Sequence, residues 1–305
     1  MLVDFLDKIY SSLVKLNKFQ SFLRFIIRRS AQLIVPVWFK SIPSSSNVLG
    51  NNNCNNNVTV TLTTFPERIN KLWIVIECLL RQTSTPDKIL IWLSKEQFPN
   101  GFKNIPKSLM RYLNLNLIEI FFVDDDLRSH KKYYYAFQKF PQDVLITIDD
   151  DIIYPSNIIF DLLNLHEHYP DTICCLRGWK VLHNEDGEII PYKDWDKISG
   201  LFGPNLKIFH TSGGGTLYRT NFFSKEVLNN EVFMQHCFYA DDVWLNIMAQ
   251  LNKTKTVKGE YFSNLLPVQN ASNKLSVSNV EQGGNDEQIK ALINYYKIKE
   301  HEIFS

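Results

Sequence analysis

The segment DVLITIDDDIIYP, residues 143–155, joins an apolar run to three consecutive aspartates. The run at 143–148 is almost continuously hydrophobic and is bounded by charge, which is typical of a strand buried on both faces. Such strands occur in mostly parallel sheets covered by helices, and these sheets bind ligands beyond the carboxyl ends of their strands. The segment therefore predicts an α/β fold with a functional site at Asp149, Asp150 and Asp151.

Three adjacent carboxylates repel one another. In an extended chain alternate side chains share a face, which places Asp149 and Asp151 together and Asp150 opposite. Mg²⁺ or Mn²⁺ would offset the repulsion, because these ions take oxygen ligands and keep positions open for phosphate oxygens. A solvated turn or helix cap is the alternative. The position directly after a buried strand favours a metal or substrate site.

Strands and helices alternate around this segment. Apolar residues at helical spacing predict helices at 69–82, 243–251 and 287–296. Pro66 and the Pro86 turn separate the elements that precede the aspartates. Period-two or continuous apolar runs predict strands at 58–65, 88–94 and 117–123.

A second acidic pair, Asp241 and Asp242, begins the predicted helix at 243–251. One carboxylate there can serve as a helix cap. The other interpretation is a general base, since a carboxylate at a cleft can remove a proton from an attacking hydroxyl.

Other candidate side chains have a functional and a structural interpretation. Basic residues after the strand at 117–123 either neutralise phosphate oxygens or form a solvated helix face. Glycines at 213–215 either allow close backbone approach to a ligand or form a plain turn, and no GK[ST] sequence follows to indicate a P-loop. Aromatic side chains either stack on sugar rings or belong to the core. These aromatic residues are Trp179, Trp195 and Tyr218.

VLITIDDDIIYP resembles the DXD segment of glycosyltransferases with the GT-A fold. Four further segments resemble parts of the same family in the same order, so the resemblance covers about residues 58–265. They are LTTFPERI (62–69), DDLRSHKKYYYAF (125–137), SGGGTLYRTNFF (212–223) and YADDVWL (239–245).

The resemblance implies a GT-A fold and transfer of a sugar, with inversion, from a nucleotide-sugar to a hydroxyl of a glycan or lipid-linked acceptor. Asp151 would be the principal metal ligand for Mn²⁺ or Mg²⁺, and Asp149 would contact the ribose or the metal. Asp150 could take either of these roles. Asp242 would be the base, with Asp241 in reserve because the family's usual Glu-Asp is Asp-Asp here. The implied donor-binding residues are Thr63, Thr64, Phe65, Arg68, Arg128, Lys131 and Lys132, and the implied acceptor-side residues are Gly213, Gly214 and Gly215.

Two other classes remain open. A metal-dependent nucleotidyltransferase also combines an α/β sheet with strand-end aspartates, and would release pyrophosphate. A non-catalytic sugar-binding protein could retain the same fold without turnover. The products formed from nucleotide-sugars distinguish these three classes.

Residues 1–40 carry seven basic against two acidic residues and apolar residues at helical spacing. This pattern predicts an amphipathic basic helical segment that lies on an anionic membrane surface, or else packs on the domain or on a second protomer in a homo-oligomer. The Ser/Asn-rich stretch 41–57 predicts a flexible linker to a catalytic domain at 58–265. Residues 266–305 are expected to form a loop and a helix.

The composition limits the partners and the compartment. The chain has 305 residues and a net charge of +1, so nothing draws it as a whole to nucleic acid. Its five cysteines form no CxxC pair, which favours a reducing compartment. With no recognisable signal peptide, a cytoplasmic protein is expected, peripheral on the membrane's cytoplasmic face if the basic segment binds lipid.

Overall fold

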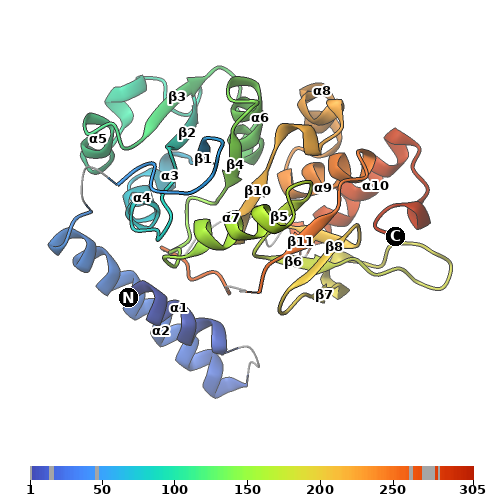
Figure 1. The fold of residues 1–305 in the computed structure, drawn as a ribbon, viewed down its shortest axis with the longest axis horizontal. Coiled ribbons are helices and arrows are strands. Elements are labelled where there is room, and N and C mark those ends of the chain that lie inside the picture. Colours follow the sequence, from blue (N-terminus) through green and yellow to red (C-terminus); the bar gives the residue numbers. More distant parts are fainter. Residues whose placement is uncertain (1, 14–16, 45–47, 261–263, 270–278, 281) are drawn as a thin grey trace.

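The computed structural model describes residues 2–13, 17–44, 48–260, 264–269, 279–280 and 282–305. Its centre is an eight-stranded sheet in the order β3-β2-β1-β4-β10-β5-β11-β8 (Figure 1). A three-stranded sheet, ordered β7-β6-β9, lies beside it. The strands are β1 (Val58–Thr63), β2 (Lys88–Ser94), β3 (Glu119–Val123), β4 (Val144–Thr147), β5 (Ile173–Cys175), β6 (Gly178–Lys180), β7 (Asp196–Lys197), β8 (Phe202–Asn205), β9 (Ile208–His210), β10 (Thr216–Tyr218) and β11 (Thr256–Lys258).

Strands β3, β2, β1 and β4 are mutually parallel, as are β5 and β11, while β10 and β8 are antiparallel to their neighbours. This confirms the predicted α/β class with a mostly parallel sheet. Since parallel strands end at the same edge, the loops after β1, β3 and β4 meet there. The helices are α1 (Leu2–Ser12), α2 (Lys18–Ser41), α3 (Pro66–Ile69), α4 (Leu72–Leu80), α5 (Lys107–Asn114), α6 (Lys131–Lys139), α7 (Ile158–His168), α8 (Asn230–His236), α9 (Asp241–Leu251) and α10 (Gly284–Tyr296).

The two faces of the sheet bury alternate side chains. On β2, Ile89 and Ile91 face a core shared with α4, α5 and α7, whereas Leu90 and Trp92 face a second core shared with α6, α9 and α10. This alternation is the period of two that a strand imposes. Helices therefore cover both faces, as expected for a parallel sheet.

Several predicted boundaries shift. The strand predicted at 58–65 ends at Thr63, and Pro66 starts the short helix α3. The helix predicted at 69–82 is α4, which begins only at Leu72. The helix expected from 243 begins at Asp241, so both aspartates lie in its first turn.

The N-terminal segment forms two helices, α1 and α2, which pack along one flank of the molecule (Figure 1). Leu6, Val35 and Phe39 are buried in the core that also contains α4. Ser156 N donates to Asp4 Oδ1 at 2.7 Å, which fastens α1 to the loop after the aspartates. One side of this segment is therefore part of the core. No helix among the described residues is long and apolar enough to cross a membrane.

The described part of the segment predicted as a flexible linker is attached to the domain. Asn51 N donates to Thr85 Oγ1 at 3.0 Å, and Asn52 Nδ2 donates to Thr85 O at 3.0 Å and to Asp87 Oδ2 at 3.3 Å. The asparagines that suggested a tether supply these hydrogen bonds. Residues 48–57 are thus fastened to the domain by hydrogen bonds.

Candidate active site

One large cleft opens at the carboxyl edge of the parallel strands. It brings together segments that follow β1, β3 and β4, the loop at 211–213 and the start of α9. Gly214 and Gly215 are buried outside its lining. The predicted site residues that line the cleft are Thr63, Thr64, Phe65, Arg68, Arg128, Lys131, Lys132, Asp149, Asp150, Asp151, Gly213, Asp241 and Asp242.

The three aspartates do not alternate as an extended strand would require. The strand ends at Thr147, and Asp150 and Asp151 lie in a turn. Arg68 Nη1 consequently contacts both Asp150 Oδ1, at 2.8 Å, and Asp151 Oδ2, at 2.9 Å. Asp150 also accepts a hydrogen bond from Thr64 Oγ1. The expected pairing of Asp149 with Asp151 is therefore replaced by an Arg68 bridge between Asp150 and Asp151.

Burial raises the pKa of Asp151 to about 7, with Asp150 and Asp149 adding to the rise and Arg68 opposing it. An additional cation would stabilise the charged form of this carboxylate, which burial penalises. The Arg68 guanidinium lies over the Phe65 ring, 4.9 Å from its centroid. Thr63 Oγ1 donates to Trp92 O at 2.8 Å, so this hydroxyl links β1 to β2.

Lys132 is the central cation of the cleft. Its Nζ lies 3.0 Å from Asp149 Oδ1 and 2.9 Å from Asp241 Oδ2, and it donates to Ser212 Oγ at 2.6 Å. Burial lowers the pKa of Lys132, but the carboxylates, led by Asp149, raise it well above its ordinary value. The Lys132 side chain thereby links Asp149, the glycine loop at residues 211–215 and the start of α9.

Of the other predicted cations, Lys131 forms an ion pair with Asp126. Arg128 is half-exposed and lies 3.8 Å from the same carboxylate. His130 lies behind them, where its ring nitrogens are 2.8 Å from Tyr133 Oη and 2.8 Å from Cys237 O. Burial lowers the pKa of His130 to about 4, so this histidine is neutral and structural.

The glycine loop is packed closely on its neighbours. A Cβ at Gly213 would lie 3.1 Å from Asp149 Oδ2, and one at Gly214 would lie 2.4 Å from Arg177 Cβ. Gly215 has φ +90°, a conformation that favours glycine. The glycines thus let the loop pass between Asp149 and Arg177.

Asp241 and Asp242 have different surroundings. Asp241 is buried against Lys132, whose charge outweighs the effect of burial and lowers the pKa of Asp241. Asp242 Oδ1 accepts from both Ser212 N and Ser212 Oγ at 3.0 Å, and among the described residues nothing donates to its Oδ2. Burial, with the Asp241 charge, raises the pKa of Asp242 to about 7. Asp242 therefore has the properties of a proton acceptor, and Asp241 those of a fixed anion.

The three aromatic residues considered for stacking on sugar rings lie in different environments. Trp195 and Tyr218 are buried in the core, as their structural interpretation predicts. Trp179 is half-buried and lines the cleft. The loop expected within residues 266–305 falls largely at 270–278, outside the described residues.

The sequence did not indicate several cleft residues. Arg177 follows β5, whose three residues give too short a pattern to recognise. Ser212 is the first residue of the segment at 212–223, and its hydroxyl beside the glycines is the signal for this role in the sequence. Tyr10 and Arg28 reach the cleft from α1 and α2, which only the packing of those helices reveals.

Whether the carboxylates fit a divalent cation depends on what completes the site. Among the described residues, no three His, Cys, Asp or Glu side chains form a metal-binding group. However, the side chains of Asp149 and Asp151 are 37% and 24% exposed. Mg²⁺ commonly binds one or two protein carboxylates and takes its other ligands from water and substrate phosphates. Both aspartates line the cleft and are partly exposed, so each is open to a cation that is shared with a phosphate-bearing ligand.

No protein-family model matches the chain, and no curated protein sequence matches it. Three solved structures are similar in part. The 4-diphosphocytidyl-2C-methyl-D-erythritol synthase of Anaerococcus prevotii is 14% identical over 80% of this chain and 97% of its own, with a TM-score of 0.42. TarS of S. aureus (residues 1–349) is 11% identical over 68% and 59%, with a TM-score of 0.44. An apo UDP-glucose pyrophosphorylase is 8% identical over 79% and 98%, with a TM-score of 0.38. Similarities this distant assign no activity to this chain.

Proposed function

We propose that the protein is a metal-dependent, inverting glycosyltransferase that moves a sugar from a nucleotide-sugar to a hydroxyl of a glycan or lipid-linked acceptor. The observation that carries this proposal is the placement of two different carboxylate sites in one cleft. Asp149 and Asp151 lie at one, and Asp242, with its raised pKa, lies at the other. The order of the GT-A-like segments along the chain supports it.

In this mechanism Asp149 and Asp151 would hold the divalent cation, and the cation would supply positive charge for the departing diphosphate. Arg128 adds a half-exposed positive charge to the lining of the cleft. The half-buried Phe65 ring offers the nucleotide base an apolar surface. Asp242 accepts the proton of the acceptor hydroxyl as that oxygen attacks the anomeric carbon. Lys132 holds Asp149 and Asp241 in fixed positions throughout.

The test is product analysis of the full-length protein with a panel of nucleotide-sugars and Mn²⁺. Release of nucleoside diphosphate, slow with water and faster with an acceptor, is expected. Release of pyrophosphate would instead indicate nucleotidyl transfer. Absence of turnover and of donor binding across the panel would contradict the proposal.

An Asp151→Ala variant should bind the donor at least about 10- to 100-fold more weakly in the presence of Mn²⁺. The substitution removes one of two carboxylates available to the cation, while Asp150 keeps its contact with Arg68. Calorimetric titration with and without metal measures the effect. Asp171→Ala, an exposed aspartate outside the cleft, is the control. Equal donor affinity in both variants would remove Asp151 from the metal site.

We also propose that α2 attaches the enzyme to an anionic membrane surface. Its outer face exposes Phe19, Phe22 and Leu33 by 68%, 58% and 72%. Steps of three, four or seven residues place these side chains, with Ile26 and Val37, on one stripe. The exposed basic residues Lys18, Arg29 and Lys40 belong to the same helix. Aromatic and aliphatic side chains beside basic ones are the combination that anionic bilayers bind.

A Phe22→Ser/Leu33→Ser variant of the full chain should lose at least about tenfold in partitioning to phosphatidylglycerol vesicles, because burial of each apolar side chain in lipid is favourable. Cosedimentation measures this, and added salt should weaken binding of the wild type. Phe160→Ser, at a 51% exposed site on α7, is the control. Wild-type protein that does not bind the vesicles but dimerises through this face would contradict the membrane assignment.

A further inference from the structure

Arg177 is a half-buried cation in the cleft that the proposed chemistry does not use. Its Nη1 donates to Thr211 Oγ1 at 2.9 Å, and its Cζ lies 4.0 Å from the centroid of the Trp179 ring. No carboxylate lies within ion-pair distance of Arg177 in the described parts of the chain. A guanidinium carries several N–H donors in a planar fork, so most of its hydrogen-bonding capacity is available to a ligand.

The position of Arg177 places it beside the acceptor, given the proposed function. Thr211, which holds the guanidinium, precedes Ser212, which donates twice to Asp242. The glycine loop lies between Asp149 and Arg177, because a Cβ at Gly213 would meet Asp149 and one at Gly214 would meet Arg177. Arg177 is thus next to the proposed base and separated by the loop from the proposed cation site.

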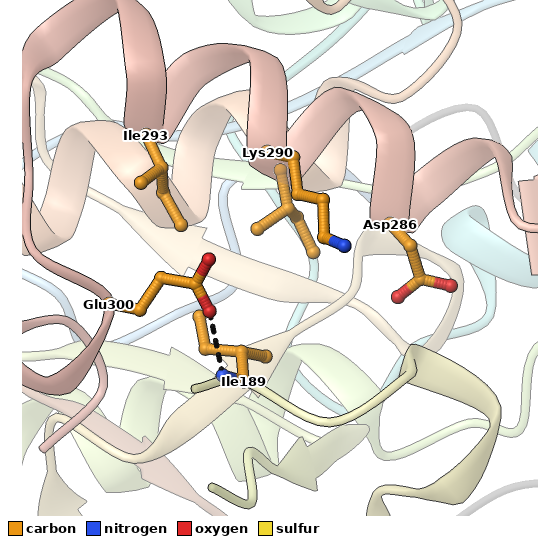
Figure 2. A pocket seen from close by; sticks show the side chains of 6 residues that line it. Ile189, Asp286, Lys290, Ile293 and Glu300 are labelled. Carbon is orange, nitrogen blue, oxygen red and sulfur yellow. Dashed lines mark hydrogen bonds between the residues drawn. The ribbon is translucent and has the colours of Figure 1, made fainter. Parts of the chain in front are cut away.

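The wall around Arg177 is fixed to the rest of the molecule. Tyr192 lines the cleft here, and its ring centroid lies 6.1 Å from that of Trp179. Tyr192 N donates to Asp286 Oδ1 at 2.8 Å, and Ile189 N donates to Glu300 Oε2 at 2.9 Å. Figure 2 shows the second of these bonds beside α10, where Ile189, Asp286 and Glu300 are among the residues that line a small pocket. Both ends of the loop at 189–192 are therefore anchored, which preorganises the wall.

We infer that Arg177, positioned by Trp179 and Thr211, binds an anionic group of the acceptor. The inference rests on the proposed function and adds the substrate class: a sugar that carries a carboxylate or phosphate near the hydroxyl that Asp242 deprotonates. A guanidinium matches either oxyanion with paired, charge-assisted hydrogen bonds. Neutral sugars of the same shape leave those donors unpaired, so the site discriminates by charge.

The experiment measures binding without turnover, by ligand-observed NMR on the full-length protein. The three ligands are methyl β-D-glucuronide, glucose 6-phosphate and methyl β-D-glucoside. We expect at least one charged ligand to bind about 10- to 100-fold more tightly than the neutral glucoside. Which charged ligand binds better distinguishes carboxylate from phosphate. Arg177→Gln should abolish the preference, and Arg177→Lys should retain part of it because the charge remains without the fork.

Arg128→Gln, which changes another arginine of the cleft lining, is the matched control and should keep the preference. Thermal unfolding of each variant establishes that it is folded. Wild-type protein that shows no preference for either charged ligand, including failure to bind any of the three, would overturn the inference. So would an Arg177→Gln variant that keeps the preference, or an Arg128→Gln variant that loses it. Donor turnover is measured separately, so a failure of the glycosyltransferase proposal is seen independently of this result.

Discussion

An Asp242→Asn variant is expected to transfer sugar about 10²- to 10⁴-fold more slowly than the wild type and to bind the donor equally well. Asparagine keeps the size of the side chain and can still accept hydrogen bonds from Ser212 through its amide oxygen. It cannot accept the proton of an attacking hydroxyl. Measured turnover and donor titration together separate the two effects.

The pH dependence gives a second readout for Asp242. Its pKa is raised to about 7, chiefly by burial, and only the deprotonated carboxylate can act as a base. The wild-type turnover rate should therefore rise as pH increases through about 7, and this rise should be absent in the variant. An Asp242→Asn enzyme of normal rate would contradict the assignment. Equal loss of donor affinity in Asp242→Asn and Asp151→Ala would contradict the separation of their roles.

The sequence predicted where the cleft lies, because the position of the cleft depends on topology. A buried strand followed by aspartates locates the carboxyl edge of a parallel sheet, and the strand predicted at 88–94 matches β2 residue for residue. The apolar spacing after Asp242 likewise predicted α9. These patterns extend over several residues, so local propensity and burial agree.

Pairing within the site could not be predicted in the same way. The alternation expected for Asp149–Asp151 assumed an extended chain, whereas a turn brings Asp150 and Asp151 to one guanidinium. Arg68 is some eighty residues away in sequence, and its contacts depend on how α3 meets the loop after β4. Side-chain pairs of this kind are properties of tertiary structure.

The N-terminal segment shows the same limit. Its helical spacing predicted an apolar face that meets either lipid or protein, and α2 has two such faces. Ala31, Val35 and Phe39 are buried in the core, while Phe22 and Leu33 are exposed. Truncation at residue 40 would uncover the core, so point substitutions on the exposed face are the better test of membrane binding.

A Lys132→Met variant is expected to lose about 3–5 kcal/mol of unfolding free energy, because removal of one partner of a buried ion pair leaves the other charge uncompensated. The Lys132 side chain is 4% exposed, and that of Asp241 is 10% exposed. Asp149 is 37% exposed, so water compensates its charge in part and it contributes less to the loss. Methionine fills a similar volume, which limits the effect of a cavity. Urea unfolding of the full-length protein measures the change.

Two further variants separate charge from packing in this result. Lys139→Met, an exposed lysine on the same helix, should leave the unfolding free energy within about 0.5 kcal/mol of the wild type. A Lys132→Met/Asp241→Leu double variant should recover much of the lost stability, since it removes the orphaned carboxylate as well. The double variant could instead lose further unfolding free energy, by as much as an independent core substitution costs. That result would show that Lys132 and Asp241 are not coupled. In that case Lys132 contributes to stability by packing, and its charge does not hold Asp149 and Asp241 of α9 together.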